Sequence, residues 1–131
     1  MYVLVYNKDR FVEITKEFTF ESAHYLNEYE GECANLHGHT YKLLVTVKGT
    51  VNEIGMVMDF KELKEIVKNE VINRLDHKCL NHVVPFNPTA ENLAMWIYDI
   101  LSERINCDRY YVMKVELYET PTSKVVVGKV V

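Results

Sequence analysis

Two histidines, His37 and His39, are separated by one glycine just before a segment with strand patterning. On an extended chain, side chains two residues apart project from the same face, with their Cα atoms roughly 6.5 to 7 Å apart. His24 ends an earlier segment in phase with Phe18 and Phe20, so pairing of the two segments brings a third imidazole alongside. Three nitrogen ligands without a fourth protein ligand are typical of a catalytic zinc site with one open position.

The spacing alone leaves a second interpretation open, because a single histidine is more often a surface or hydrogen-bonded residue. Cys33 lies four residues before His37 in a polar loop, where a metal or an imidazolium would lower the pKa of its thiol. The resulting thiolate could act as a nucleophile or base. A small buried hydrophobe remains the commoner role of a free cysteine.

Asp76 and His77 follow a predicted helix and form a candidate acid–base pair. Adjacent side chains rarely hydrogen-bond each other in regular structure, so loop geometry or another partner must bring the two together. The helix macrodipole offers an alternative role for His77, because an imidazolium is stabilised at a helix C-terminus.

Glu119 has the same strand parity as four apolar residues: Tyr111, Met113, Val115 and Leu117. We therefore expect its carboxylate to point toward an apolar face, where an unpaired charge is costly and requires a partner. A solvated strand end is the alternative.

The elements that must position these residues follow from hydrophobic periodicity. Alternation predicts strands from about residue 12 to 24, over 41–47, over 111–117 and in a valine-rich segment ending at 131. Spacing of three and four predicts helices over 60–75 and from Thr89 to Ile105, with Asp59 and Thr89 at their N-termini. The order ββααββ predicts an α+β domain: a four-stranded antiparallel sheet with two helices on one face.

Composition restricts the class of protein. The chain of 131 residues is 48% hydrophobic, which is enough for one core and predicts a single domain over residues 1–131. A net charge of −4 argues against nucleic acid as a partner. Three cysteines without a C-x-x-C pair favour a reducing cytoplasmic location, and no segment reaches the roughly 20 apolar residues of a membrane helix.

Six stretches of the sequence, in this order and spacing, resemble the 6-pyruvoyl-tetrahydropterin synthase and 6-carboxytetrahydropterin synthase superfamily over nearly the whole chain. The stretches are Phe20–His24, Cys33–His39, Gly55–Phe60, Leu75–Asn81, Pro88–Leu93 and Glu119–Thr120. The gap between Cys33 and His37 looks like the shorter one of the carboxy branch.

The resemblance implies a tunnelling fold in which three ββααββ subunits close a β-barrel and two trimers form a homohexamer. It implies that His24, His37 and His39 bind Zn2+. By matching position, Cys33 is the general base, and Asp76 and His77 are its acid–base partners across a subunit interface. Glu119 is the implied anchor of the pterin ring, with Thr89 and Glu91 close to the pterin pocket.

The implied reaction is that of a zinc-dependent lyase acting on 7,8-dihydroneopterin triphosphate. The carboxy branch yields 6-carboxy-5,6,7,8-tetrahydropterin, acetaldehyde and triphosphate, an early step toward queuosine and other 7-deazaguanine nucleosides. The pyruvoyl branch only eliminates triphosphate. A third interpretation is a catalytically silent, zinc-stabilised binding module in which Cys33 completes a closed Cys-His₃ site.

Overall fold

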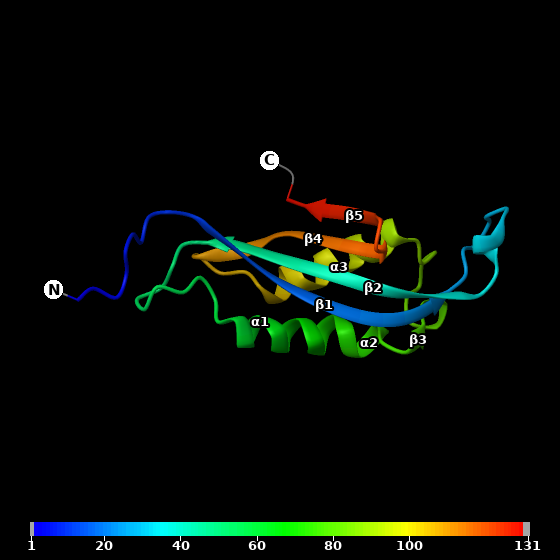
Figure 1. Cartoon of the computed structure of the whole chain (residues 1–131), viewed down its shortest axis with the longest axis horizontal. Helices are drawn as coiled ribbons and strands as arrows, with labels where there is room; N and C mark the ends of the chain where they lie inside the picture. The colour runs from blue at the N-terminus through cyan, green and yellow to red at the C-terminus, as the bar shows by residue number, and fades with distance from the viewer. Residues whose placement is uncertain (1, 130–131) are drawn as a thin grey trace.

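The structure, a computed structural model, describes residues 2–129 and contains a five-stranded sheet with the strand order β3-β1-β2-β4-β5 (Figure 1). The four main strands are antiparallel neighbours: β1 (Val12–His24), β2 (His37–Gly49), β4 (Tyr110–Thr120) and β5 (Ser123–Gly128). The fifth strand, β3 (Lys78–Cys79), has only two residues and pairs in parallel with the end of β1. The predicted four-stranded sheet is therefore corrected to five strands.

The helical segments begin where the sequence predicts. Helix α1 (Phe60–Val67) continues through a π-helical turn (Lys68–Ile72) into α2 (Asn73–Leu75), and together these cover the predicted range 60–75. The Asp59 side chain accepts a hydrogen bond from the Lys61 backbone N–H (2.8 Å) and caps α1. Thr89 accepts from the Asn92 N–H (3.1 Å) and caps α3 (Ala90–Arg104). Short 3₁₀ turns lie at Glu32–Ala34 and Leu80–His82.

One face of the sheet packs against the helices and forms the core. Alternate residues of β1 and β2 are buried on that face, including Phe18, Phe20, Tyr41 and Leu43. The intervening residues, such as Glu17, Glu21 and Thr40, are exposed on the opposite face. Because side chains alternate along a strand, polar and apolar positions are sorted onto the two faces as predicted. Among residues 2–129 no helix is both long and apolar enough to cross a membrane.

The face pattern of β4 differs from the prediction. The sequence predicted one inward-facing set: Tyr111, Met113, Val115 and Leu117. The structure buries a different set: Val112, Val115 and Leu117. Along β2 the partner of Thr46 is Lys114, but the partner of the next residue is Val112. Met113 is therefore the extra residue of a β-bulge, which reverses the faces on its N-terminal side.

The sheet is open at both edges within one chain. On the outer side of β1, strand pairing is confined to Ser22 and Ala23, so the described structure gives residues 12–21 no strand partner on that side. Strand β5 forms the other edge. The barrel implied by the resemblance is not closed by a single chain, and the predicted end of the last strand at Val131 lies outside the described residues.

Candidate metal centre and active site

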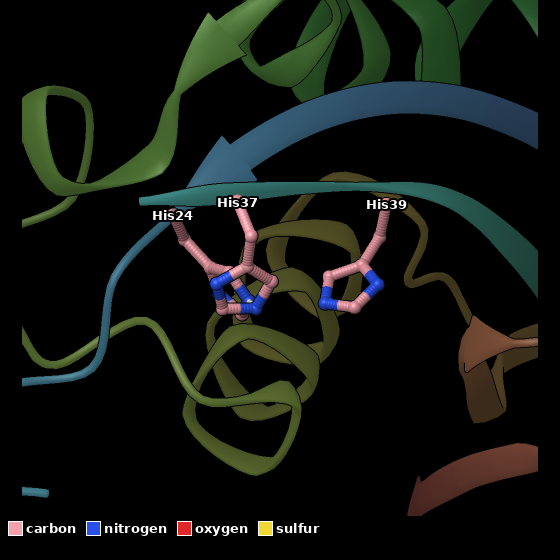
Figure 2. A group of neighbouring side chains, drawn as sticks. All are labelled: His24, His37 and His39. Atoms are coloured by element: carbon pink, nitrogen blue, oxygen red, sulfur yellow. Dashed lines mark hydrogen bonds between the residues drawn. The ribbon is translucent and has the colours of Figure 1, made fainter. Parts of the chain in front are cut away.

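The three predicted histidines meet at one end of the sheet. The long antiparallel pairing of β1 and β2 begins with Val12 opposite Gly49 and ends with His24 directly opposite His37. His39 follows on the same face of β2. One ligand atom from each of the three rings lies within 4.8 Å of the others (Figure 2). The sequence prediction that strand pairing brings His24 alongside the other two is confirmed.

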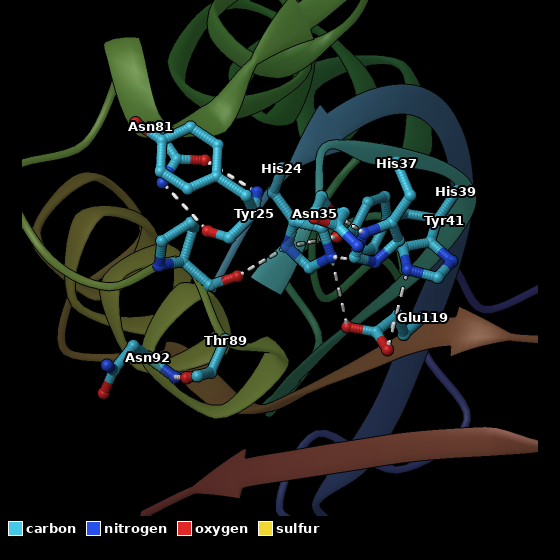
Figure 3. Close-up of polar contacts among 11 residues, drawn as sticks. His24, Tyr25, Asn35, His37, His39, Tyr41, Asn81, Thr89, Asn92 and Glu119 are labelled. Carbon is cyan, nitrogen blue, oxygen red and sulfur yellow. Dashed lines mark hydrogen bonds and ion pairs between the residues drawn. The ribbon is translucent and has the colours of Figure 1, made fainter. Parts of the chain in front are cut away.

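Backbone carbonyls fix two of the imidazoles. His24 Nδ1 lies 2.8 Å from the Pro88 carbonyl, and His37 Nδ1 lies 2.7 Å from the Asn35 carbonyl (Figure 3). A carbonyl oxygen only accepts hydrogen bonds, so both Nδ1 atoms carry the proton and donate. Anchoring of the second ring nitrogen to a carbonyl is the usual arrangement around a metal-bound histidine.

This anchoring leaves two bare lone pairs facing each other. With Nδ1 protonated, the neutral rings of His24 and His37 have unprotonated Nε2 atoms, and these lie only 3.1 Å apart. His39 Nε2 is buried and has no hydrogen-bond partner in the described structure. Lone pairs placed this closely repel each other unless a cation lies among them, so the donor set fits a bound metal ion.

Burial further prepares His39 as a ligand. Desolvation lowers the pKa of His39, and the neighbouring His24 and His37 lower it as well, against an opposing effect of Glu119. Metal ions bind the neutral form of imidazole, so a lowered pKa reduces competition from protons. The neutral state required of a metal ligand is therefore favoured by the protein itself.

Glu119 reaches the same cluster from β4. Its carboxylate oxygens lie 4.0 Å from His24 Nε2 and 3.8 Å from His39 Nε2 (Figure 3). The side chain is 29% exposed, and these distances are too long for direct hydrogen bonds. The Glu119 carboxylate therefore retains acceptor capacity for a ligand beside the metal centre. Its charge also acts on Tyr41, whose hydroxyl lies 3.4 Å from His24 Nδ1: burial and the charge of Glu119 both raise the pKa of Tyr41.

The three residues implied in pterin recognition share one hollow. Thr89, Glu91 and Glu119 line a surface cavity of about 370 Å³ that also includes Lys124. The Thr89 hydroxyl oxygen accepts a hydrogen bond from the Asn92 N–H in the first turn of α3, so the hydroxyl proton is free to donate to a ligand. Helix α3 and strand β4 thus contribute to the same recess although they are distant in sequence.

Asp76 and His77 do pair, through loop geometry as expected. His77 has a left-handed backbone (φ 57°), and its Nδ1 lies 3.0 Å from Asp76 Oδ2. The second Asp76 oxygen accepts from the Glu21 backbone N–H (2.9 Å). This backbone hydrogen bond lowers the pKa of Asp76, and the His77 side chain lowers it further. The imidazole is 74% exposed and contacts Glu21, on the face of β1 opposite His24.

Cys33 lies in the 3₁₀ turn of the loop between β1 and β2, where its carbonyl accepts from the Leu26 N–H (2.9 Å). Within residues 2–129 no hydrogen bond joins its thiol to Asp76, His77 or the three histidines. One chain therefore assembles the histidine cluster with Glu119, but it does not join the candidate base to its candidate acid–base partners.

Two asparagines that sequence reasoning missed hold the chain after β1. Asn81 exchanges two hydrogen bonds with the backbone of Tyr25, at 3.0 and 2.9 Å. Asn87 accepts from the Asn27 N–H at 2.9 Å. The partners are 56 and 60 residues apart, so no local pattern could reveal them. These contacts tie the segment following His24 to the loop that carries Pro88.

Comparison with known proteins shows which family the chain is similar to. Residues 13–129 match the 6-pyruvoyl tetrahydropterin synthase family. The 6-carboxy-5,6,7,8-tetrahydropterin synthase of Haemophilus influenzae is 35% identical over 136 residues, covering 85% of this chain and 94% of that protein. The dihydroneopterin monophosphate aldolase of Pyrococcus furiosus is 46% identical over 87 residues, covering 66% and 68%.

A solved structure supports the same relationship. The 6-pyruvoyl tetrahydropterin synthase of Caenorhabditis elegans superposes with a TM-score of 0.83 at 26% identity, covering 95% of this chain and 99% of that one. Sequence and fold therefore agree over almost the whole length of the chain. The protein belongs to the 6-pyruvoyl tetrahydropterin synthase family.

Proposed function

We propose that the protein is a zinc-dependent lyase that converts 7,8-dihydroneopterin triphosphate and water to 6-carboxy-5,6,7,8-tetrahydropterin, acetaldehyde and triphosphate. The observation that carries this proposal is the histidine cluster with its facing Nε2 atoms beside Glu119. Support for the carboxy branch comes from the short gap between Cys33 and His37 and from the Haemophilus relative.

His24, His37 and His39 would hold the zinc ion. Bound there, zinc would supply Lewis acidity to the side-chain oxygens of the substrate and so favour loss of neighbouring protons. The carbonyls of Pro88 and Asn35 keep two of the rings in the tautomer that presents Nε2. Because β1 and β2 are paired along their full length, the ligands are held before any substrate arrives.

The proton transfers are assigned to Cys33, His77 and Asp76. As a thiolate, Cys33 would remove a proton from the substrate side chain, and the His77–Asp76 pair would return or relay protons. The lowered pKa of Asp76 keeps its carboxylate ionised, so it can orient the imidazole. Since one chain does not join Cys33 to this pair, we assign the complete site to neighbouring subunits of a homohexamer, a dimer of trimers.

The pterin ring is assigned to the hollow lined by Thr89, Glu91 and Glu119. A carboxylate can accept two parallel hydrogen bonds from a ring N–H and an exocyclic amino group, which a pterin presents side by side. Glu119 lies beside the imidazoles, so a ring held by it would have its side chain at the metal centre.

A second candidate is the pyruvoyl activity, in which triphosphate is eliminated without carbon–carbon cleavage. The similarity to the Caenorhabditis enzyme, which is named for that activity, supports this candidate. Incubation of the zinc-loaded protein with 7,8-dihydroneopterin triphosphate, followed by mass spectrometry, separates the two. We expect 6-carboxytetrahydropterin and acetaldehyde. Formation of 6-pyruvoyl-tetrahydropterin alone would assign the pyruvoyl activity instead.

Two controls belong to this experiment. The Pyrococcus relative is named for a monophosphate substrate, so 7,8-dihydroneopterin monophosphate should be assayed beside the triphosphate. Cys33→Ala protein should lose activity but keep its zinc. If Cys33→Ala instead lost both zinc and fold, Cys33 would be a structural ligand and the chain a zinc-stabilised module.

A further inference from the structure

The sheet contains a notch beside the metal centre. Strand β2 pairs with β4 only from Lys42 onward, where its partner is Tyr118. The residues of β2 before this point pair with β1 alone, while β4 continues to Thr120 and pairs with β5. A hollow of about 520 Å³ occupies the space where β2 and β4 diverge.

The notch connects the metal centre to the sheet face that carries no helices. Its inner wall includes His39 and Glu119, and its outer wall includes Lys42 and Thr19. His39 and Lys42 are three residues apart on one strand, which separates their Cα atoms by about 10 Å. A ligand that reaches the imidazoles can therefore extend through the notch to the open face.

The lining of the outer part is rich in hydrogen-bond donors. Among residues 2–129, Lys42 is the one Lys or Arg in the lining, and Thr19, Thr120 and Tyr118 add hydroxyl groups. The Thr40 hydroxyl also lies in the lining, but it donates to Glu21 Oε1 (3.3 Å). Within the described part of the chain, the only carboxylate in the lining is Glu119, at the inner end. An ammonium group and hydroxyl donors together suit a ligand that carries many negatively charged oxygens.

Lys42 is held at this place but is not neutralised there. Its Nζ lies 4.2 Å from the centroid of the Tyr118 ring, which keeps the ammonium at the mouth of the notch. Its nearest carboxylate, Glu17, lies 3.9 Å away and has a 60% exposed side chain. Such an exposed contact contributes little and can be exchanged for a stronger anion.

We propose that the outer notch is the subsite for the triphosphate of the substrate, with Lys42 as its principal cation. This inference rests on the proposed function, because it places the pterin at Glu119 and the side chain at the imidazoles. The triphosphate then extends past His39 to Lys42. The same cation stabilises the negative charge of the departing triphosphate, so it serves both binding and elimination.

The direct test measures binding of inorganic triphosphate to the zinc-loaded protein by calorimetry. Lys42→Met keeps the apolar stem over Tyr118 but removes the charge, and we expect about 10-fold weaker binding or more. Lys42→Arg should retain most of the affinity. The matched control is Lys48→Met, because Lys48 lies on the same strand and face but over Phe11, at the other end of the sheet.

Affinity for unphosphorylated 7,8-dihydroneopterin and the zinc content should be unchanged in Lys42→Met. Equal losses for triphosphate and for dihydroneopterin, or equal effects of Lys42→Met and Lys48→Met, would overturn the subsite. So would a wild-type protein that does not bind inorganic triphosphate. If the wild-type protein turns over the pterin substrate but Lys42→Met binds triphosphate as tightly as wild type, the subsite is refuted and the proposed function stands. If triphosphate binding depends on Lys42 but the wild-type protein does not turn over the pterin substrate, the subsite stands and the proposed function is refuted.

Discussion

The two histidine regions of the molecule are built in opposite ways. His24 at the end of β1 is only 1% exposed, its Nδ1 is fixed by a carbonyl, and its Nε2 faces two other imidazoles. His77 at the edge of β1 is 74% exposed and is held by Asp76 in a left-handed turn. One chain brings together all three imidazoles of the first region, whereas in the second region the His77 imidazole is oriented by Asp76 but exposed to solvent.

Under the proposed function, the difference separates what one chain provides from what a neighbouring subunit would add. A metal ligand needs fixed geometry and a neutral ring, and burial between paired strands provides both. A proton-transfer group needs access to substrate, and exposure on a turn provides it. In the proposed homohexamer, a neighbouring chain at one of the two open sheet edges would bring Cys33 to His77.

The largest effect is expected from breaking the buried region. His37→Ala should remove most of the bound zinc and lower kcat/KM by about 1,000-fold or more, because Lewis acidity at such a site is worth several kcal/mol. His24→Ala and His39→Ala should behave alike. Metal analysis of dialysed protein checks this, with the exposed His82→Ala as the control. Unaltered zinc stoichiometry in all three variants would refute the metal centre.

The exposed region is tested without loss of metal. Cys33→Ala and His77→Ala should each lower kcat by about 100- to 1,000-fold while zinc content stays normal, because each removes one proton-transfer group. Mixed subunits of the two variants should regain part of the activity if neighbouring chains complete each site. A monomer by light scattering that keeps full activity on dilution would contradict the shared site.

In the proposed function, Glu119 holds the pterin beside the metal centre. Glu119→Gln keeps the size of the side chain but turns one acceptor into a donor that faces the pterin donors. Pterin binding should weaken by about 2 to 4 kcal/mol with zinc content unchanged. Ligand titration beside wild type measures this effect. Near-normal affinity in a folded variant would leave Glu119 as a solvated strand end.

The smallest effect concerns the stability of the exposed region. The pKa of Asp76 is lowered by the Glu21 backbone N–H and by His77, so its carboxylate stabilises the folded state above the unfolded pKa of about 3.9. That contribution is lost as pH falls through the lower folded pKa. Asp76→Asn should reduce the free energy of unfolding at pH 7 by only about 0.5 to 1 kcal/mol, since the side chain is 37% exposed.

Urea unfolding at pH 7 and at acidic pH measures this difference, with the exposed Asp99→Asn as the control. The midpoints of wild type and Asp76→Asn should converge as pH falls through the lowered folded pKa of Asp76, below which both side chains are neutral. A difference that persisted undiminished in acid would show that Asp76 stabilises the fold through contacts unrelated to its charge.

The sequence by itself determined the parts of this protein that depend on local order. Alternation and helical spacing predicted the main strands and both helical segments, and Asp59 and Thr89 were recognised as caps because capping acts within one turn. The phase of His24 with Phe18 and Phe20, and of His37 with His39, predicted a shared face. Pairing of β1 with β2 then brings the three rings together.

Only the tertiary structure decided the rest, because the deciding contacts join distant residues. The two-residue strand β3 exists only where the chain crosses the end of β1, and the bulge at Met113 appears only in the register against β2. The tautomers of His24 and His37 depend on carbonyls whose positions no side-chain pattern encodes. The notch beside Lys42 likewise arises from the divergence of β2 and β4, which is a property of the sheet and not of either strand alone.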